Sequence, residues 1–193
     1  MNIIQIYGRQ PDTRAIESVA EVLRRGGIAI IPTDTLYALV CNGLNSKAIE
    51  KLSQIKGLTE KHLLSVICKD MSQAAQYARI ENKAYRMMKD QLPGPVTYIL
   101  PAANTLPKAF KGRKTVGIRV PDNDFARAVA QELDAPLMCT SVACDEPGNP
   151  DSVEWTYEAN PDIELIIKAD ILSGAPSSIV DLQNPDQPEI LRQ

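Results

Sequence analysis

The sequence has few of the residues that hold metal ions or cross-link small secreted domains. Its 193 residues include a single histidine, His62, and four cysteines at positions 41, 68, 139 and 144, none in a CxxC pair. Structural zinc sites need closely spaced cysteine and histidine ligands, so the common zinc motifs are excluded. Since disulfides are rare in the cytosol, we interpret the cysteines as free and mostly buried thiols.

Long hydrophobic runs are also missing. No apolar stretch approaches the roughly 18–20 residues that a membrane-spanning helix needs. The first residues, MNIIQIYGRQ, lack the basic start, long apolar stretch and small-residue cleavage site of a secretory signal peptide. We therefore expect a cytoplasmic protein that does not interact with a membrane.

Several motifs of nucleotide and acyl-transfer chemistry are absent. The sequence contains no GxxxxGK[ST] loop, no GxGxxG turn and no GxSxG nucleophile elbow. A bound nucleotide would have to be held by scattered cations, hydroxyls and backbone amides. Any transfer chemistry would depend on positioning and electrostatics, with Mg²⁺ brought in by the nucleotide and no tightly bound metal.

Composition and charge indicate a globular chain with an uneven charge distribution. Hydrophobic residues make up 44% of the sequence, which is enough for a real core, and the net charge is −3. Residues 145–193 hold eleven acidic and two basic residues, so residues 1–144 carry a net positive charge. Such asymmetry fits a surface for polyanions or an acidic layer that only solvates the protein. The overall balance argues against a dedicated, strongly basic nucleic-acid binder.

Strand-like and helix-like segments alternate along the chain. Short apolar runs predict strands, and amphipathic stretches bounded by Asp, Asn, Ser or Thr at the start and by Gly or Pro at the end predict helices. Some strands follow each other without an intervening helix, which favours a mixed sheet over a doubly wound parallel one. We therefore predict a single α/β domain over residues 1–193. The expected strands are 2–7, 28–31, 63–70, 96–100, 115–121, 137–141, 163–167, 177–182 and 189–192; the expected helices begin at 12 or 13, 45 or 46, 70, 82 and 122, with 144–161 as loop that has room for one helical turn.

Polar residues recur where these strands begin or end. In "IIPTDTLYAL", Thr33 and Thr35 directly follow a buried run, and hydroxyl residues flank later strands in the same way. Strand ends line ligand-binding crevices in α/β folds, although strand ends also need polar turn residues. Arg119 lies between Ile118 and Val120, so it must find an anionic partner, either a structural carboxylate or a ligand. The other hydroxyls are Thr97, Thr140, Ser141, Ser177 and Ser178.

An ordered set of segments resembles the YrdC-like, or threonylcarbamoyl-AMP synthase, superfamily. The segments are "RRGGIAIIPTDTLYAL", "PGPVTYIL", "TVGIRVPD", "CTSVACDEPG", "PSSIVDL" and "EILR", and the resemblance runs over about residues 10–192. The resemblance implies a YrdC/RibB-like fold, a twisted mixed sheet with helices around a concave basic cavity. It also implies condensation of L-threonine, bicarbonate and ATP into threonylcarbamoyl-adenylate for tRNA modification. Some family members bind double-stranded RNA.

The resemblance also implies roles for individual residues. Thr35, Arg119 and Ser178 match positions that contact threonine, and we expect Thr33, Tyr37 and Thr140 at the same substrate site. On the nucleotide side, the matching residues are Lys56, His62, Thr115, Ser141 and Arg192.

Two family motifs are altered in this sequence. The KxR motif reads Lys56-Gly57-Leu58, and the SxN motif reads Ser141-Val142-Ala143. Leu58 together with His62 resembles the YciO branch of the superfamily. The leading hypothesis is a protein that binds a nucleotide and a small carboxylate, with weak or altered threonylcarbamoyl-AMP synthase activity. The alternatives are a double-stranded RNA or tRNA-binding protein without synthase activity, and a paralogue that binds another small anion.

Overall fold

The computed structural model describes residues 2–8, 12–57, 64–104, 106, 113–157, 160–170 and 172–193. All strands in these ranges join one ten-stranded sheet. The helices are α1 (Thr13–Arg24), α2 (Ser46–Lys56), α3 (Met71–Tyr77), α4 (Asn82–Lys89), α5 (Asp124–Leu133) and α6 (Pro150–Tyr157). The strands are β1 (Asn2–Gln5), β2 (Ile28–Ile31), β3 (Ala38–Asn42), β4 (Ser65–Ile67), β5 (Val96–Pro101), β6 (Thr115–Arg119), β7 (Leu137–Ser141), β8 (Ile163–Lys168), β9 (Ser178–Asp181) and β10 (Glu189–Arg192).

Four of the helices begin at an aspartate or asparagine cap. The side chains of Asp12, Asn45, Asp70 and Asn123 each accept a hydrogen bond from the backbone N–H three residues further on, at distances of 2.8–3.1 Å. These bonds satisfy backbone donors that the first helical turn leaves free. Helix α2 ends at Gly57, whose φ of +64° is the left-handed conformation that glycine adopts at low cost.

The sheet is mixed, and its order departs strongly from chain order. The strands run β1-β8-β2-β3-β7-β4-β6-β5-β9-β10. The β1/β8, β2/β8, β4/β6 and β5/β9 pairs are parallel, and the remaining neighbours are antiparallel. This order places β6, from the middle of the chain, beside β5, and places the C-terminal pair β9 and β10 beyond β5 at the sheet edge.

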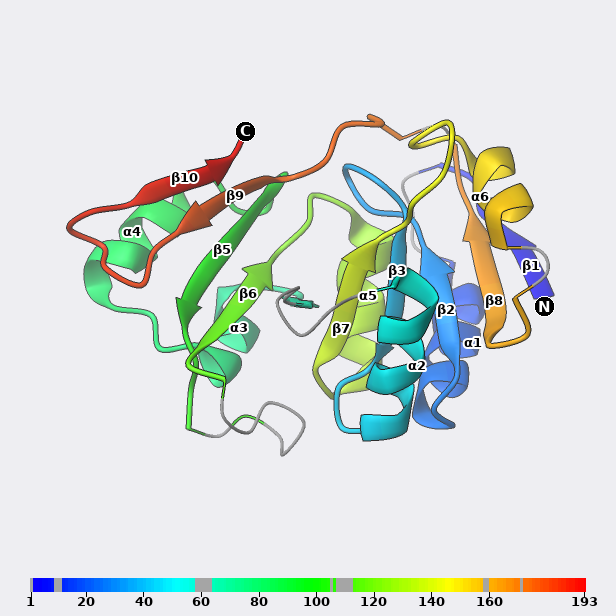
Figure 1. Cartoon of the computed structure of the whole chain (residues 1–193), viewed down its shortest axis with the longest axis horizontal. Helices are drawn as coiled ribbons and strands as arrows, with labels where there is room; N and C mark the ends of the chain where they lie inside the picture. The colour runs from blue at the N-terminus through cyan, green and yellow to red at the C-terminus, as the bar shows by residue number, and fades with distance from the viewer. Residues whose placement is uncertain are drawn as a thin grey trace.

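Helices cover the two faces of the sheet unequally. One core cluster joins residues of α2, α3, α4 and α6 to one face, and a second joins α1 and α5 to the other. In Figure 1, α1 and α5 lie behind β2, β3 and β7, and α3 and α4 lie behind β5, β6 and β9. The sheet twists between these two sets of strands, so the two pairs of helices cover opposite faces of it. Of the described helices, none lies in front of β5, β6 and β9 in this view. Side chains on that face of these strands are therefore free to form a site.

The predicted mixed α/β sheet is confirmed, with three local differences. Strand β3 lies in the second apolar run of "IIPTDTLYAL", which had not been predicted as a strand. Helix α6 occupies residues expected to be loop, and Pro150 is its first residue, where a missing N–H does no harm. The cap of α5 is Asn123 instead of Asp122, because the Asn123 side chain accepts the Ala126 N–H.

Candidate functional site

One row of paired residues crosses four neighbouring strands and builds the floor of the site. Arg119 of β6 pairs with Thr97 of β5, Thr97 with Ile179 of β9, and Ile179 with Arg192 of β10. Directly paired residues in a sheet project from the same face. The row therefore forms a strip on one face of the sheet, with a guanidinium group at each end and Thr97 and Ile179 at its centre.

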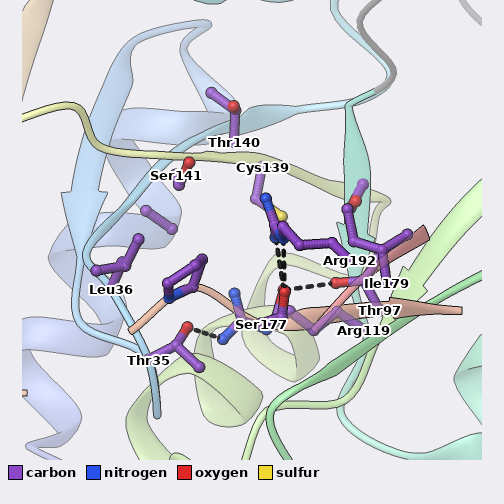
Figure 2. Close-up of a pocket in the computed structure, with 13 residues that line it drawn as sticks. Thr35, Leu36, Thr97, Arg119, Cys139, Thr140, Ser141, Ser177, Ile179 and Arg192 are labelled. Atoms are coloured by element: carbon purple, nitrogen blue, oxygen red, sulfur yellow. Dashed lines mark hydrogen bonds between the residues drawn. The ribbon is translucent and has the colours of Figure 1, made fainter. Parts of the chain in front are cut away.

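A cavity of about 140 Å³ lies over this row. In Figure 2, Leu36, Ser141 and Thr140 lie on one side and Arg192, Ile179, Thr97 and Arg119 on the other, with a dashed line from Thr35 to Arg119. The charged lining residues among those described are both cationic. The described residues that line it are Thr35, Leu36, Ala38, Ser65, Thr97, Arg119, Cys139, Thr140, Ser141, Pro176, Ser177, Ile179 and Arg192.

Arg119 is held by the three polar residues that follow β2. Its Nη2 donates to Thr33 Oγ1 at 3.1 Å, to Asp34 Oδ1 at 2.6 Å and to Thr35 Oγ1. The arginine is 8% exposed, and its Nε is buried without a hydrogen-bond partner in the described part of the chain. A buried donor without a partner is unfavourable, so the site is suited to a ligand that brings an acceptor.

Thr33 organises the turn that presents Thr35. Its hydroxyl donates to the Leu36 carbonyl oxygen at 2.6 Å and accepts from the Thr35 backbone N–H at 3.2 Å. The Thr35 carbonyl oxygen in turn accepts from the Ser173 hydroxyl at 3.2 Å and from the Gly174 N–H at 3.3 Å. The turn is thus fixed from within and from the segment that precedes β9.

Ser177 joins the other side of the cavity to Arg192. Its carbonyl oxygen accepts from Arg192 Nε at 2.9 Å and from Nη2 at 2.7 Å, and its hydroxyl lies 3.1 Å from Thr97 Oγ1. These bonds, drawn in Figure 2, orient the second guanidinium along the strip. A ligand that lies between the two arginines would meet a guanidinium group at each end and hydroxyl groups between them.

Five of the residues expected at a site line this cavity. Thr35, Arg119, Thr140, Ser141 and Arg192 come from four separate strands or strand ends, and the sheet order brings them together. Because these residues are spread over the chain, no single sequence motif is enough to identify the site.

Two further candidates lie on the same strands but outside the cavity. Ser178 does not line it; side chains alternate along a strand, and the cavity is lined instead by Ser177 and Ile179 on either side. Thr115 begins β6 and shares the face of Arg119, four residues away, which is about 13 Å along a strand. Only a ligand that extends along β6 could contact both Thr115 and Arg119.

Thr33 and Tyr37 are placed behind the cavity wall. Thr33 is fully buried and lies among protein partners. Tyr37 is 1% exposed, and its hydroxyl donates to the Ala169 carbonyl oxygen at 3.3 Å and accepts from the Ala169 N–H at 3.0 Å. Both side chains are hydrogen-bonded to protein groups, and the substrate contacts expected from the sequence stay predictions.

The nucleotide-side candidates are described less completely. Lys56 ends α2 and does not line the cavity; burial lowers the pKa of its ammonium group, and the neighbouring Cys144 partly opposes this shift. Leu58 and His62 lie outside the described residues. Of the altered KxR motif, the structure therefore describes only the lysine and the glycine.

Sequence reasoning missed Ser65 as part of this site, and it missed the ion pair that Asp34 forms there. Asp34 belongs to the segment singled out for its threonines, but its pairing with Arg119 over 85 residues of sequence depends on the sheet order. Ser65 lines the cavity from β4, opposite Gly117 of β6. A hydroxyl at the start of a buried strand was the available signal for Ser65.

The lining lacks a group that would act as a base at neutral pH. Burial raises the pKa of the Cys139 thiol to about 11, although the positive charge of Arg119 lowers it in part, so the thiol stays protonated. Within the described ranges, no group of three His, Cys, Asp or Glu side chains could hold a metal ion. Chemistry at this site would depend on hydrogen bonds, positive charge and orientation.

Comparisons with known proteins place the chain in a family. The model of the Sua5/YciO/YrdC family, described as "Telomere recombination", matches residues 21–193. The chain is 32% identical to the protein YciO of Escherichia coli over 97% of its own length and 93% of that protein. It is 30% identical to the human threonylcarbamoyl-AMP synthase, over 93% of this chain and 67% of the human protein.

The similarity extends to solved structures. The crystal structure of E. coli YciO matches with a TM-score of 0.90 at 30% identity and covers 100% of this chain and 95% of YciO. The crystal structure of P. abyssi Sua5 complexed with L-threonine matches with a TM-score of 0.87 at 25% identity. This chain is fully covered in that match but spans 57% of Sua5.

No described helix is both long and apolar enough to cross a bilayer. The fold and the relatives agree with the sequence resemblance, including the YciO-like branch. The family match covers most of the chain, and the structural matches cover all of it. The protein therefore belongs to the Sua5/YciO/YrdC family.

Proposed function

We propose that the cavity binds L-threonine beside a nucleotide and supports synthesis of threonylcarbamoyl-adenylate. The observation that carries this proposal is Arg119, which lines the cavity beside the Thr35 hydroxyl and whose buried Nε has no acceptor among the described residues. A ligand carboxylate would supply the missing acceptor, and charge-assisted hydrogen bonds of this type are short and strong. A threonine carboxylate would therefore bind at Arg119, close to the Thr35 hydroxyl.

The size of the cavity limits what it holds. A volume of about 140 Å³ is below the ~300–1,000 Å³ of pockets that enclose drug-sized ligands. It is suited to an amino acid, whereas a nucleotide would extend beyond it. Ser141 and Arg192 at the cavity and Thr115 further along β6 are the residues we propose for the nucleotide. Mg²⁺ would enter with ATP as part of the substrate.

The proposed reaction balances without a catalytic base from the lining. Bicarbonate loses hydroxide to give CO₂, the neutral threonine amine forms a bond to the carbon of CO₂, and the proton lost from nitrogen combines with the hydroxide, which gives a carbamate and water. A carbamate oxygen then attacks the α-phosphorus of ATP, and the bond to the bridging oxygen breaks to release pyrophosphate. Arg119 would hold the substrate carboxylate and Arg192 would offset negative charge, so that rate enhancement comes from orientation and electrostatics.

The proposal is tested by pyrophosphate release from ATP, bicarbonate and L-threonine. We expect release that requires all three substrates and that falls ~100-fold or more in Arg119→Ala, because a charge-assisted contact to the substrate is lost. Thr35→Val, which is nearly isosteric, should also lower the rate of pyrophosphate release. It replaces Arg119→Ala as the test variant if Arg119→Ala does not fold. Arg24→Ala, which removes a guanidinium paired with Glu132 outside the cavity, should retain the wild-type rate. Release that is independent of L-threonine, or unchanged in Arg119→Ala, would contradict the proposal.

A further inference from the structure

We infer that Asp34 is a positioning residue that fixes the orientation of Arg119 toward a ligand carboxylate. The inference rests on the proposed function of the cavity as a carboxylate site. Asp34 does not line the cavity, so it would act through Arg119 and not by touching the ligand. Its test must therefore separate an effect on ligand recognition from an effect on folding.

Both oxygens of the Asp34 carboxylate are used by the protein. Oδ1 accepts from Arg119 Nη2 at 2.6 Å, and Oδ2 accepts from the backbone N–H of Asp122 at 3.0 Å. The side chains of Asp34 and Arg119 are each only 9% exposed. The second bond ties the carboxylate to the segment between β6 and α5. Asp34 can therefore rotate little without losing one of its two partners.

Donor geometry explains what this arrangement leaves for a ligand. The two hydrogens on Arg119 Nη2 are shared among three protein acceptors, Thr33 Oγ1, Asp34 Oδ1 and Thr35 Oγ1. The protein thus saturates one corner of the guanidinium and leaves the buried Nε–H without a partner. A planar guanidinium held at one corner has a fixed direction for its remaining donors. The part of the guanidinium that lines the cavity would therefore meet a ligand carboxylate in a prepared position.

Charge supports the same conclusion. Asp34 offsets the charge of Arg119, so net positive charge is a weak source of affinity on this side of the cavity. Recognition of a carboxylate must then depend mainly on the direction of N–H donors. Removing the Asp34 charge would increase the positive field, yet we expect it to weaken carboxylate binding because the guanidinium would lose its orientation.

The informative variant is Asp34→Asn, which keeps the size of the side chain. An amide has one acceptor oxygen and one donor nitrogen, so it cannot accept from both Arg119 Nη2 and the Asp122 N–H. Either orientation places an NH₂ group against another donor. Asp186→Asn is the matched control, because Asp186 forms an ion pair with Lys83 at 2.6 Å outside the cavity.

The first measurement compares L-threonine with L-threoninamide, which lacks the carboxylate, by isothermal titration calorimetry. In Asp34→Asn we expect the preference for L-threonine over the amide to fall about 10-fold or more, mainly through weaker L-threonine binding. Asp186→Asn should keep the wild-type preference. A purely structural role for Asp34 would lower both affinities by the same factor, and an unchanged preference would overturn the inference.

The second measurement needs no ligand. In ¹⁵N-edited NMR spectra of the wild-type protein, the Arg119 Nε–H should give a distinct signal that exchanges slowly with water, assigned by its loss in Arg119→Lys. In Asp34→Asn that signal should broaden or exchange faster while the backbone spectrum stays folded. If the wild-type protein binds no L-threonine, the proposed function fails and this signal alone decides the inference. A wild-type-like Arg119 signal in Asp34→Asn would overturn it.

Discussion

Thr33, at the scale of a single residue, shows how one buried hydroxyl can prepare a site without touching a ligand. It donates to the Leu36 carbonyl oxygen and accepts from the Thr35 N–H and from Arg119. The turn after β2 is thereby closed on itself, and Thr35 is left at the cavity surface. A turn with so many internal bonds orders the lip of the cavity before any ligand arrives.

The sequence indicated which polar residues were important but not how they pair. Arg119, between two apolar residues of a strand, predicted a buried cation with a partner, and that partner could have been a carboxylate or a ligand. Both descriptions apply to different atoms: Asp34 contacts Nη2, and Nε remains without a partner. Such a division depends on side-chain orientation, which no sequence pattern specifies.

Tyr37→Phe is expected to lower stability without changing L-threonine affinity. The hydroxyl makes two hydrogen bonds to the backbone of Ala169, and its loss leaves a buried N–H and C=O without that partner. We expect the free energy of unfolding to fall by ~1–3 kcal/mol, measured by urea denaturation. If affinity falls while stability is unchanged, Tyr37 contacts the substrate, as the sequence had suggested.

At the scale of elements, the tight packing of β4 against β6 sets the shape of the cavity floor. Gly117 of β6 is paired with Ser65 of β4, and a Cβ atom on Gly117 would lie 2.7 Å from Ser65 Oγ. Gly117 lies two positions before Arg119 on β6, and its lack of a side chain leaves room for the hydroxyl of Ser65 on β4. Larger side chains on both strands would overfill this part of the sheet.

Gly117→Ala should destabilise the protein by ~1–3 kcal/mol, as overpacking of a well-packed core does. Adding Ser65→Ala should relieve most of this effect, because the nearest remaining Ser65 atom would be its Cβ at 3.4 Å, an ordinary contact. Thermal or urea unfolding of the two single variants and the double variant measures the coupling. Equal losses of stability in Gly117→Ala with and without Ser65→Ala would show that this contact is not the cause.

Elements with a strong local signal were predictable, and those defined by their surroundings were not. Helices α1, α2 and α3 have Asx caps and apolar stripes, and the structure confirms these. Helix α6 was missed because its proline-containing segment has a weak periodic pattern, and it packs on β8. Strand β3 was missed because its apolar run directly follows a polar turn, and its pairing with β2 and β7 defines it.

At the scale of the whole molecule, sheet order makes the site, and sheet order was not predictable from this sequence. Strand β8 lies between β1 and β2, and β4 lies between β7 and β6, so most neighbours are distant in sequence. The same order brings residues 35, 119, 141 and 192 to one cavity. The family resemblance relates whole ordered sets of segments. It could therefore assign these distant residues to one site, which periodicity could not do.

The central claim is that this cavity recognises L-threonine through Arg119 and Thr35, and titration calorimetry with L-threonine tests it most directly. We predict saturable binding to the wild-type protein and to Arg24→Ala, and affinity at least about 10-fold weaker in Arg119→Lys and Thr35→Val. No binding of L-threonine to the folded wild-type protein, or equal affinity in all four proteins, would contradict the claim.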